Sequence, residues 1–211
     1  MNNLIIDSLE KYKNFINSNS NEKVKILIHA CCAPCSSEVL NELKQHADIT
    51  IYYYNPNTYP YEEYIKRYDE FNKLPYSFDI INEQYNEQEY LDFVNGYTHL
   101  KEGSLRCYKC YELRLKQTAK KAKELGFDYF TTTLSISPYK NSKWINELGF
   151  KFSEEYDVRF MYSDFKKNDG YKKSIVLSKE YNLYRQEYCG CRFSIEEMKE
   201  RVLNKQNNKE E

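Results

Sequence analysis

The sequence predicts a single α/β domain in which helices flank a mostly parallel sheet. Short apolar runs of β-forming residues alternate with amphipathic stretches of helical period through most of the chain, which is the pattern of strand–helix–strand units. The chain of 211 residues is long enough for one domain with a substantial core and too short for two full-sized ones. We therefore expect the α/β domain over residues 23–205, preceded by a helical extension (1–22) and followed by a disordered tail (206–211).

Each expected element has a local cause. The runs KILIH and ITIYYY consist of apolar or β-forming residues and suit buried strands. Glycines at 96, 126 and 149 follow periodic apolar stretches and are typical helix stops. Ser194 and Glu197 have the spacing of a capping box at the start of the last helix. In chain order we expect a helix at 3–18, a strand at 25–29, a helix at 33–46, a strand at 49–54, a helix at 61–73, a strand at 76–81, helices at 86–95 and 108–125, a strand at 128–133, a helix at 141–148, a strand at 158–162, and helices at 171–182 and 194–204.

The composition excludes several classes of protein. Aromatic residues make up 16% of the chain, which a disordered protein would lack, and Gly and Pro are too few for a collagen-like sequence. No stretch approaches the roughly 18 apolar residues of a membrane span, and the start MNNLIIDSLEKYKNF lacks the features of a signal peptide. We expect a cytoplasmic protein without a membrane partner, whose seven cysteines are kept reduced.

The net charge of −1 conceals an uneven distribution. Residues 1–100 carry a balance of −7 and residues 101–192 a balance of +7. Basic side chains interleaved with aromatic rings suit a nucleic-acid backbone and unstacked bases, whereas a solvated surface is the simpler interpretation of charge alone. The basic stretch contains Lys140, Lys143, Lys166, Lys167, Lys172, Lys173, Arg185 and Arg192, with Tyr139, Tyr171, Tyr184 and Tyr188 between them.

The cysteines are clustered, and clustered cysteines in a reducing compartment are more often metal ligands or redox groups than disulfides. Four thiolates bind either a zinc ion or an iron–sulfur cluster. Adjacent cysteines and wide, irregular spacing favour the cluster, with the first two cysteines at two corners and the C-x-x-C pair at the other two. The groups are Cys31, Cys32 and Cys35 after the first expected strand, Cys107 and Cys110 at the start of the long helix, and Cys189 and Cys191 before the last helix.

Cys189 and Cys191 differ in kind from the other groups, because one glycine separates them. A C-x-C pair permits a strained, redox-active disulfide, and a dithiol carries two electrons. The alternative is that both are further metal ligands. Cys35 stays unassigned.

Three weaker candidates accompany the cysteines. His29 is either a ligand or proton donor or, more commonly for such a residue, a packed and hydrogen-bonded one. Asp164 and Asp169 are acid or ligand candidates that solvated loop carboxylates equally explain. The hydroxyls of 131–133 and 135–137 suit either a polar substrate or a helix cap. No nucleotide-binding fingerprint is present.

Six blocks of the sequence stand out, and they are HACCAPCS (29–36), YYYNPNTYPYEEY (52–64), RCYKCYELRL (106–115), FDYFTTTLSISPYKN (127–141), SDFKKNDGYKKS (163–174) and LYRQEYCGCRFS (183–194). Together they resemble the QueH-type epoxyqueuosine reductases and cover about residues 24–200 in the order of that family.

The resemblance implies a cytosolic oxidoreductase that removes the epoxide oxygen of epoxyqueuosine at the wobble position of tRNA. It implies a [4Fe–4S] cluster on Cys31, Cys32, Cys107 and Cys110. It assigns the catalytic, redox-active pair to Cys189 and Cys191. A further mononuclear iron is also suggested, with Cys35, Cys189 and Cys191 as candidate ligands.

The resemblance also implies a fold similar to PP-loop and HUP nucleotide-binding domains, with the cysteine motif in place of the phosphate loop. The expected partners are the anticodon loop of tRNA carrying epoxyqueuosine and an electron donor that the sequence does not identify. Two alternative functions stay open: a zinc-stabilised nucleic-acid-binding module, and a thiol oxidoreductase that uses Cys189 and Cys191 on another substrate.

Overall fold

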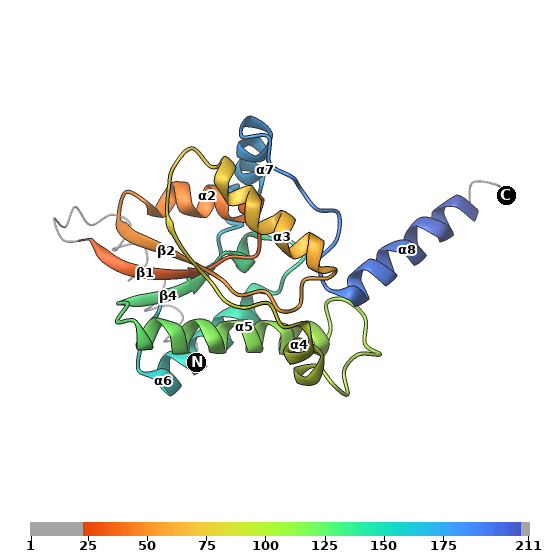
Figure 1. The fold of residues 1–211 in the computed structure, drawn as a ribbon, viewed down its shortest axis with the longest axis horizontal. Helices are drawn as coiled ribbons and strands as arrows, with labels where there is room; N and C mark the ends of the chain where they lie inside the picture. Colours follow the sequence, from red (N-terminus) through yellow and green to blue (C-terminus); the bar gives the residue numbers. More distant parts are fainter. Residues whose placement is uncertain (1–22, 208–211) are drawn as a thin grey trace.

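Five parallel strands form the centre of the fold, and helices cover both faces of the sheet (Figure 1). The structure is a computed structural model and describes residues 23–207. The strand order is β3-β2-β1-β4-β5, and each neighbouring pair is parallel. The elements are β1 (Val24–His29), α2 (Ala33–Leu43), β2 (Ala47–Tyr53), α3 (Tyr61–Asp69), η1 (Glu70–Lys73), β3 (Asp79–Asn82), α4 (Glu87–Phe93), α5 (Leu105–Glu124), β4 (Tyr129–Thr132), η2 (Thr133–Ile136), α6 (Ser142–Tyr156), β5 (Arg159–Phe160), α7 (Gly170–Glu180) and α8 (Arg192–Asn207). The predicted α/β class with a parallel sheet is confirmed, and the similarity to PP-loop and HUP folds stays a prediction.

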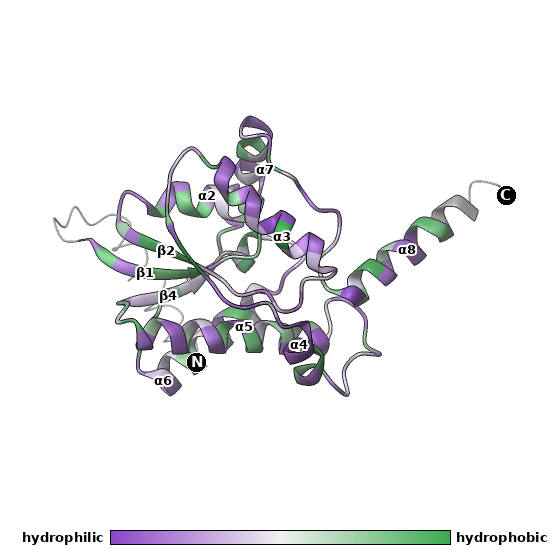
Figure 2. Ribbon diagram, viewed as in Figure 1, coloured by the Kyte–Doolittle hydropathy of each residue, from purple (hydrophilic) through white to green (hydrophobic). Residues whose placement is uncertain are grey.

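Strand β1 is buried on both of its faces, which explains its uninterrupted apolar run. Ile26 and Ile28 face a core shared with α2, whereas Leu27 faces a second core shared with α5 and α6. Helix α2 packs beside α7 on the first face, and α5 packs beside α6 on the second. Figure 2 shows the apolar residues of β1 and β2 between these two helical layers.

The chain order of the strands reverses at β1. From β1 the chain moves outward through β2 and β3, and it then returns to place β4 on the other side of β1. At such a reversal the connections after the two central strands diverge to opposite faces, leaving a crevice at the carboxyl ends of those strands. Ligands of open parallel sheets bind in this crevice, so the fold places the expected site after β1 and β4.

The predicted end of the helix at 141–148 is wrong. Helix α6 does not stop at Gly149 but continues to Tyr156. A Cβ on Gly149 would lie 2.3 Å from the ring of Phe160, so this glycine permits close packing of the helix against β5. The helix ends instead at Asp157, which has a φ of 50°.

The predicted capping box of the last helix is also wrong. Helix α8 begins at Arg192, and the hydroxyl of Ser194 donates to Cys191 O at 2.7 Å from inside its first turn. The carboxylate of Glu197 bonds to Arg106, 2.6 Å away, instead of to the helix terminus. Ser194 thus bonds locally outside the capping-box pattern, and a tertiary contact engages Glu197.

Some expectations lie outside the described residues. The expected helix at 3–18 is among them, as is most of the expected tail, although α8 extends through residue 207. Within residues 23–207, no helix combines the length and apolar character needed to cross a bilayer.

Candidate metal and thiol site

The first cysteine group lies at the carboxyl end of β1, as predicted. Cys31 and Cys32 follow the strand directly, and Ala33 begins α2. Ala30 N donates to Tyr52 O at 3.1 Å, which continues the sheet pairing up to the cysteines. Cys35 lies in the first turn of α2, so its side chain returns toward the other two. A central strand and the start of a helix therefore hold this group in place.

The thiols of Cys31, Cys32 and Cys35 form a tight triad. Their three sulfur atoms all lie within 4.8 Å of one another, and Cys31 Sγ is 3.7 Å from Cys32 Sγ. Hydrogen bonds from the thiols of Cys32 and Cys35 lower the pKa of Cys31 well below its ordinary value. The same bonds raise the pKa of the two donors. Three sulfur atoms this close together are a soft donor set that suits iron or zinc.

The structure brings Cys35 into this tight group, a role that the sequence left unassigned. Cys107 and Cys110 are not part of the triad. They lie in the first turns of α5, where Gly103 N donates to Cys107 Sγ at 3.3 Å. The predicted four-cysteine set therefore stays a prediction.

Cys107 and Cys110 are instead electrostatic neighbours of the C-G-C pair, Cys189 and Cys191. Burial, followed by the charge of Cys189, raises the pKa of Cys107 to about 11. Burial raises that of Cys110 to about 12, despite the nearby Arg114 guanidinium. Cys191 is buried as well, and both burial and Cys189 raise its pKa. Burial thus favours the neutral thiol at these three positions, whereas a bound metal would favour the thiolate.

Three buried arginines surround the cysteines. Arg67, Arg106 and Arg114 are 1%, 3% and 2% exposed. Each has one side-chain nitrogen that is buried and without a hydrogen-bond partner. Burying a guanidinium is costly unless negative charge compensates it, and buried donors are almost always paired.

The arginines differ in how much negative charge they already contact. Glu63 pairs with Arg67 at 2.7 Å, and Glu197 pairs with Arg106 at 2.6 Å. Arg114 bonds only to neutral oxygens, Asn55 Oδ1 and Cys110 O, each at 3.4 Å. Burial opposes its charge, but negative charge on the sulfurs of Cys110, Cys31 and Cys189 outweighs burial and raises its pKa.

Unpaired buried guanidinium nitrogens beside soft thiol ligands fit a negatively charged metal–thiolate group. An iron–sulfur cluster on four thiolates is such a group. The sequence analysis missed these arginines, although the sequence contained a signal. Arg114 follows Cys110 by four residues, which places both on one face of a helix.

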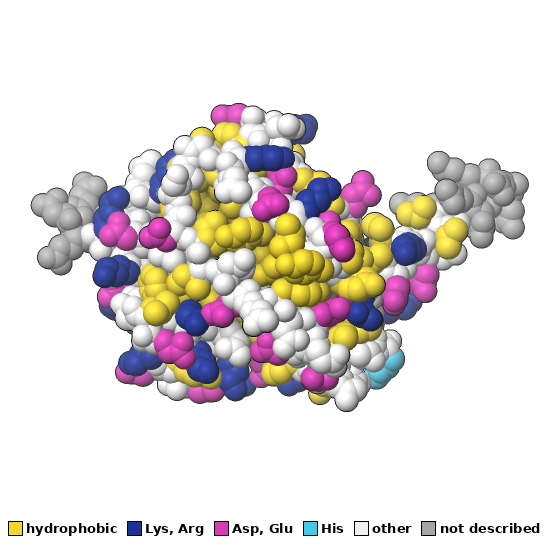
Figure 3. Space-filling model, in the orientation of Figure 1, with side chains coloured by type: hydrophobic (Ala, Val, Ile, Leu, Met, Phe, Trp, Pro, Cys, Tyr) yellow, Lys and Arg dark blue, Asp and Glu magenta, His cyan; other side chains and the backbone are white. Residues whose placement is uncertain are grey.

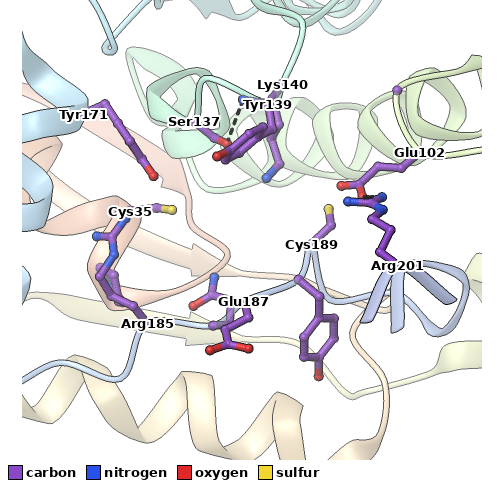
Figure 4. A pocket seen from close by; sticks show the side chains of 14 residues that line it. Cys35, Glu102, Ser137, Tyr139, Lys140, Tyr171, Arg185, Glu187, Cys189 and Arg201 are labelled. Atoms are coloured by element: carbon purple, nitrogen blue, oxygen red, sulfur yellow. Dashed lines mark hydrogen bonds and ion pairs between the residues drawn. The ribbon is translucent and has the colours of Figure 1, made fainter. Parts of the chain in front are cut away.

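A pocket of about 480 Å³ opens onto the thiols. Cys35 and Cys189 point into it from opposite sides, and the Lys140 side chain reaches down between them (Figure 4). Tyr139, on the rim, is 80% exposed. The lining residues are Pro34, Cys35, Glu102, Gly103, Ser137, Tyr139, Lys140, Tyr171, Arg185, Gln186, Glu187, Tyr188, Cys189 and Arg201.

A cluster of tyrosine rings lies on and beside α3. Tyr61 and Tyr64 stack with ring centroids 6.0 Å apart, and Tyr85 packs at a tilt against both, 5.2 and 4.7 Å away. Figure 3 shows hydrophobic side chains gathered on this face around α3. The loop before α3 contacts the C-G-C pair directly, because Tyr59 N donates to Gly190 O at 2.8 Å.

Only part of the basic stretch reaches the pocket. Lys140, Arg185 and three of the four tyrosines line it. The others point elsewhere: Lys173 pairs with Glu38, Lys172 with Asp169, and Arg192 with Glu87. Tyr184 packs under Lys66. Of the basic stretch, therefore, only these residues reach the pocket, and its role as the RNA-binding region stays a prediction.

His29 is a structural residue. It is fully buried, with Nε2 3.1 Å from Tyr54 O and Nδ1 2.9 Å from Thr132 Oγ1. A carbonyl oxygen can only accept, so Nε2 is the donor and Nδ1 accepts from Thr132. Burial, together with Arg114, lowers the pKa of His29 to about 3. The packed interpretation is confirmed.

The other weak candidates also have structural roles. Asp164 pairs with Lys166 and Lys167, and Asp169 pairs with Lys172. Neither aspartate lines the pocket. Of the hydroxyl run after β4, Ser137 reaches the pocket.

Comparison with known protein families shows to which family this chain belongs. The family model described as "Epoxyqueuosine reductase QueH" matches residues 26–197. The chain belongs to the QueH family. The match spans β1 through the first turns of α8 and therefore contains all seven cysteines. The resemblance inferred from the sequence blocks is confirmed.

Several QueH relatives cover most of this chain. The epoxyqueuosine reductase QueH of Staphylococcus epidermidis is 44% identical over 199 residues, covering 90% of this chain and 83% of the relative. That of Streptococcus pyogenes is 45% identical over 174 residues, covering 79% and 68%. That of Thermotoga maritima is 38% identical over 182 residues, covering 83% and 93%.

Proposed function

We propose that this protein reduces epoxyqueuosine to queuosine at the wobble position of tRNA, the last step of queuosine biosynthesis. The observation that supports this most directly is a pocket that opens onto redox-competent thiols in a member of the QueH family. The volume of about 480 Å³ lies within the range of small-ligand pockets, about 300–1,000 Å³.

The proposed cofactor is a [4Fe–4S] cluster on Cys31, Cys32, Cys107 and Cys110. When bound, it supplies electrons one at a time. Cys35 completes the tight thiol triad with the first two of these cysteines. The alternative to a dithiol role for Cys189 and Cys191 is that they join Cys35 as ligands of a second, mononuclear iron. The negative charge of such a metal–thiolate group would satisfy the unpaired nitrogens of Arg67, Arg106 and Arg114.

The C-G-C pair is the proposed two-electron donor. Converting an epoxide to an alkene consumes two electrons and two protons and releases water. Oxidation of Cys189 and Cys191 from two thiols to one disulfide releases the same number of each. An electron donor that is still to be identified then returns the pair to the dithiol state.

The proposed substrate enters as an unpaired base. An anticodon loop presents its wobble base unpaired, and enzymes take such bases into pockets by stacking and phosphate contacts. The exposed ring of Tyr139 stands at the pocket mouth, and Arg185 lies over the ring of Tyr171 at 5.6 Å. These side chains suit a single-stranded RNA loop.

The test is conversion of epoxyqueuosine in tRNA, measured by mass spectrometry of the nucleosides. We expect conversion by the wild type and no conversion by Cys189→Ser or Cys191→Ser. Leu125→Ser, at an exposed site outside the pocket, is the control and retains activity. Full activity in both cysteine variants would exclude the dithiol role.

A metal count on anaerobically purified protein tests the cofactor. We expect about four or more irons per chain and their loss in Cys107→Ala. Zinc without iron would favour the zinc-stabilised nucleic-acid-binding module instead. An iron protein that reduces other disulfides but not epoxyqueuosine would favour the thiol oxidoreductase.

A further inference from the structure

Lys140 occupies a central place in the pocket. Figure 4 shows its side chain between Cys35 and Cys189, with the ammonium end toward the sulfur atoms. Its charge interacts with the thiols of Cys189, Cys31 and Cys35. The ammonium therefore lies beside the C-G-C pair and the cysteine triad at once.

The backbone around Lys140 is held on both sides. Lys140 N donates to Ser137 O at 3.2 Å, and Lys166 Nζ donates to Lys140 O at 3.2 Å. The next residue, Asn141, caps α6 by accepting from Lys143 N and Trp144 N. The lysine thus projects from a short turn fixed between η2 and α6.

The charge of Lys140 is free to contact a ligand. Arg201 pairs with Glu102 and Glu197. Arg185 donates to Ser174 O and Ser178 Oγ. Lys140 Nζ makes no hydrogen bond or ion pair with another described side chain or backbone atom in the structure, and its electrostatic neighbours are the thiols of Cys189, Cys31 and Cys35 and the hydroxyl of Tyr111.

Several other ionisable groups near the thiols are buried or already paired. His29 is fully buried, and both of its ring nitrogens are already hydrogen-bonded. Glu102 is bound to Arg201. The three buried arginines do not line the pocket. The part of the chain that the structure describes leaves Lys140 as the cation that reaches both the cavity and the thiols.

We propose that Lys140 is a catalytic residue whose ammonium donates a hydrogen bond to the epoxide oxygen of the substrate. This rests on the proposed function, because it names the group that contacts the reacting oxygen. As a C–O bond of the epoxide breaks, the oxygen gains negative charge from the incoming electrons. A fixed cation in a partly closed pocket stabilises that charge without reorganising at the moment of reaction.

The atoms and electrons balance without a net proton from lysine. The epoxide and two thiols become an alkene, one disulfide and water. Both protons of the water come from Cys189 and Cys191, and the ammonium ends the cycle as it began. Lys140 therefore lowers the barrier and is not consumed.

The test compares Lys140→Met, Lys140→Arg and the wild type, all as iron-loaded protein with the tRNA substrate. Methionine keeps the length of the side chain and removes its charge. Lys120→Met makes the same substitution at a lysine that is 56% exposed and lies outside this pocket. Single-turnover conversion, the affinity for tRNA and the iron content are measured on each variant.

We expect Lys140→Met to lower the rate at saturating tRNA by about 10²–10³-fold, the range seen when one charge-stabilising donor is removed. Affinity for tRNA and iron content should stay within about two-fold of wild type. Lys140→Arg should recover part of the rate, and Lys120→Met should match the wild type.

With an active wild type, three results would overturn the proposal. An unchanged rate in Lys140→Met excludes contact with the reacting oxygen. A loss of affinity with an unchanged saturated rate shows that Lys140 binds the RNA backbone instead. A rate loss that parallels iron loss shows that it only stabilises the metal. An inactive wild type with full iron would overturn the proposed function itself and this assignment with it.

Discussion

Replacing Gly190 with alanine tests how the C-G-C pair is held. Gly190 has a φ of 125°, a conformation that residues with a Cβ rarely adopt, and a Cβ built there would lie 2.5 Å from Arg67 Nη1. Arg67 cannot easily move away, because it is 1% exposed and paired with Glu63 at 2.7 Å. The substitution therefore forces the guanidinium off Cys189 O, to which its Nη1 donates at 3.1 Å.

The expected cost follows from these two contacts. Strained backbone at such a φ costs about 1–3 kcal/mol, and a lost hydrogen bond to a charged group costs about 1.5–3 kcal/mol. Alanine also stabilises the protein by about 0.4–1 kcal/mol, because it lowers the conformational entropy of the unfolded chain. We expect a net loss of about 2–5 kcal/mol in the free energy of unfolding.

Gly126→Ala is the matched control. Gly126 also has a positive φ, 71°, but an added Cβ there would meet no atom within 4 Å. The Gly126→Ala substitution therefore isolates the effect of backbone strain, and it should lower the free energy of unfolding by about 0.5–1 kcal/mol.

Urea denaturation followed by fluorescence measures the difference. Trp144, the single tryptophan, packs edge-on against Tyr108 with ring centroids 5.5 Å apart and reports on α5 and α6. With a urea m value of about 2–3 kcal/mol/M, the midpoint should fall by about 1–2 M for Gly190→Ala. A fall no larger than that of Gly126→Ala would refute the argument that Arg67 confines the C-G-C loop.

Two further predictions concern α8 and the pocket rim. Glu197→Gln should cost about 2–3 kcal/mol of unfolding free energy at neutral pH, because it leaves the buried Arg106 charge without its carboxylate. Burial alone would raise the pKa of Glu197, but hydrogen bonds from Arg106 and Glu102 N outweigh it and lower that pKa below the ordinary 4.5. The stabilisation is therefore full above about pH 4.5 and is lost as the pH falls through the pKa of the folded state. The stabilities of the wild type and the variant should therefore converge in acid denaturation curves. A constant difference in stability across this pH range would contradict the pairing of Glu197 with Arg106. Tyr139→Ala should weaken binding of an anticodon stem-loop RNA by about 5–150-fold, from a stacking contribution of about 1–3 kcal/mol per base, while Leu125→Ala should not; equal titration curves for both variants would remove Tyr139 from the RNA surface.

Local sequence patterns predicted the parallel sheet, but they did not predict where two of the helices begin or end. KILIH is buried on both faces and forms β1 as predicted. The helix was predicted to end at Gly149, but this glycine instead makes room for the ring of Phe160, which belongs to another element. The capping box failed because Glu197 pairs with Arg106, 91 residues away. Such partners carry no local signal in a single sequence.

The sequence by itself determined the α/β class, the family and the cysteine groups, because periodicity, strand propensity and cysteine spacing are properties of contiguous residues. Only the tertiary structure decided that Cys35 joins Cys31 and Cys32, that three arginines with unpaired nitrogens surround the thiols, and that Lys140 reaches the pocket. These depend on which side chains the reversal of strand order at β1 brings together from distant segments. Their charges and burial exist only once those segments have packed.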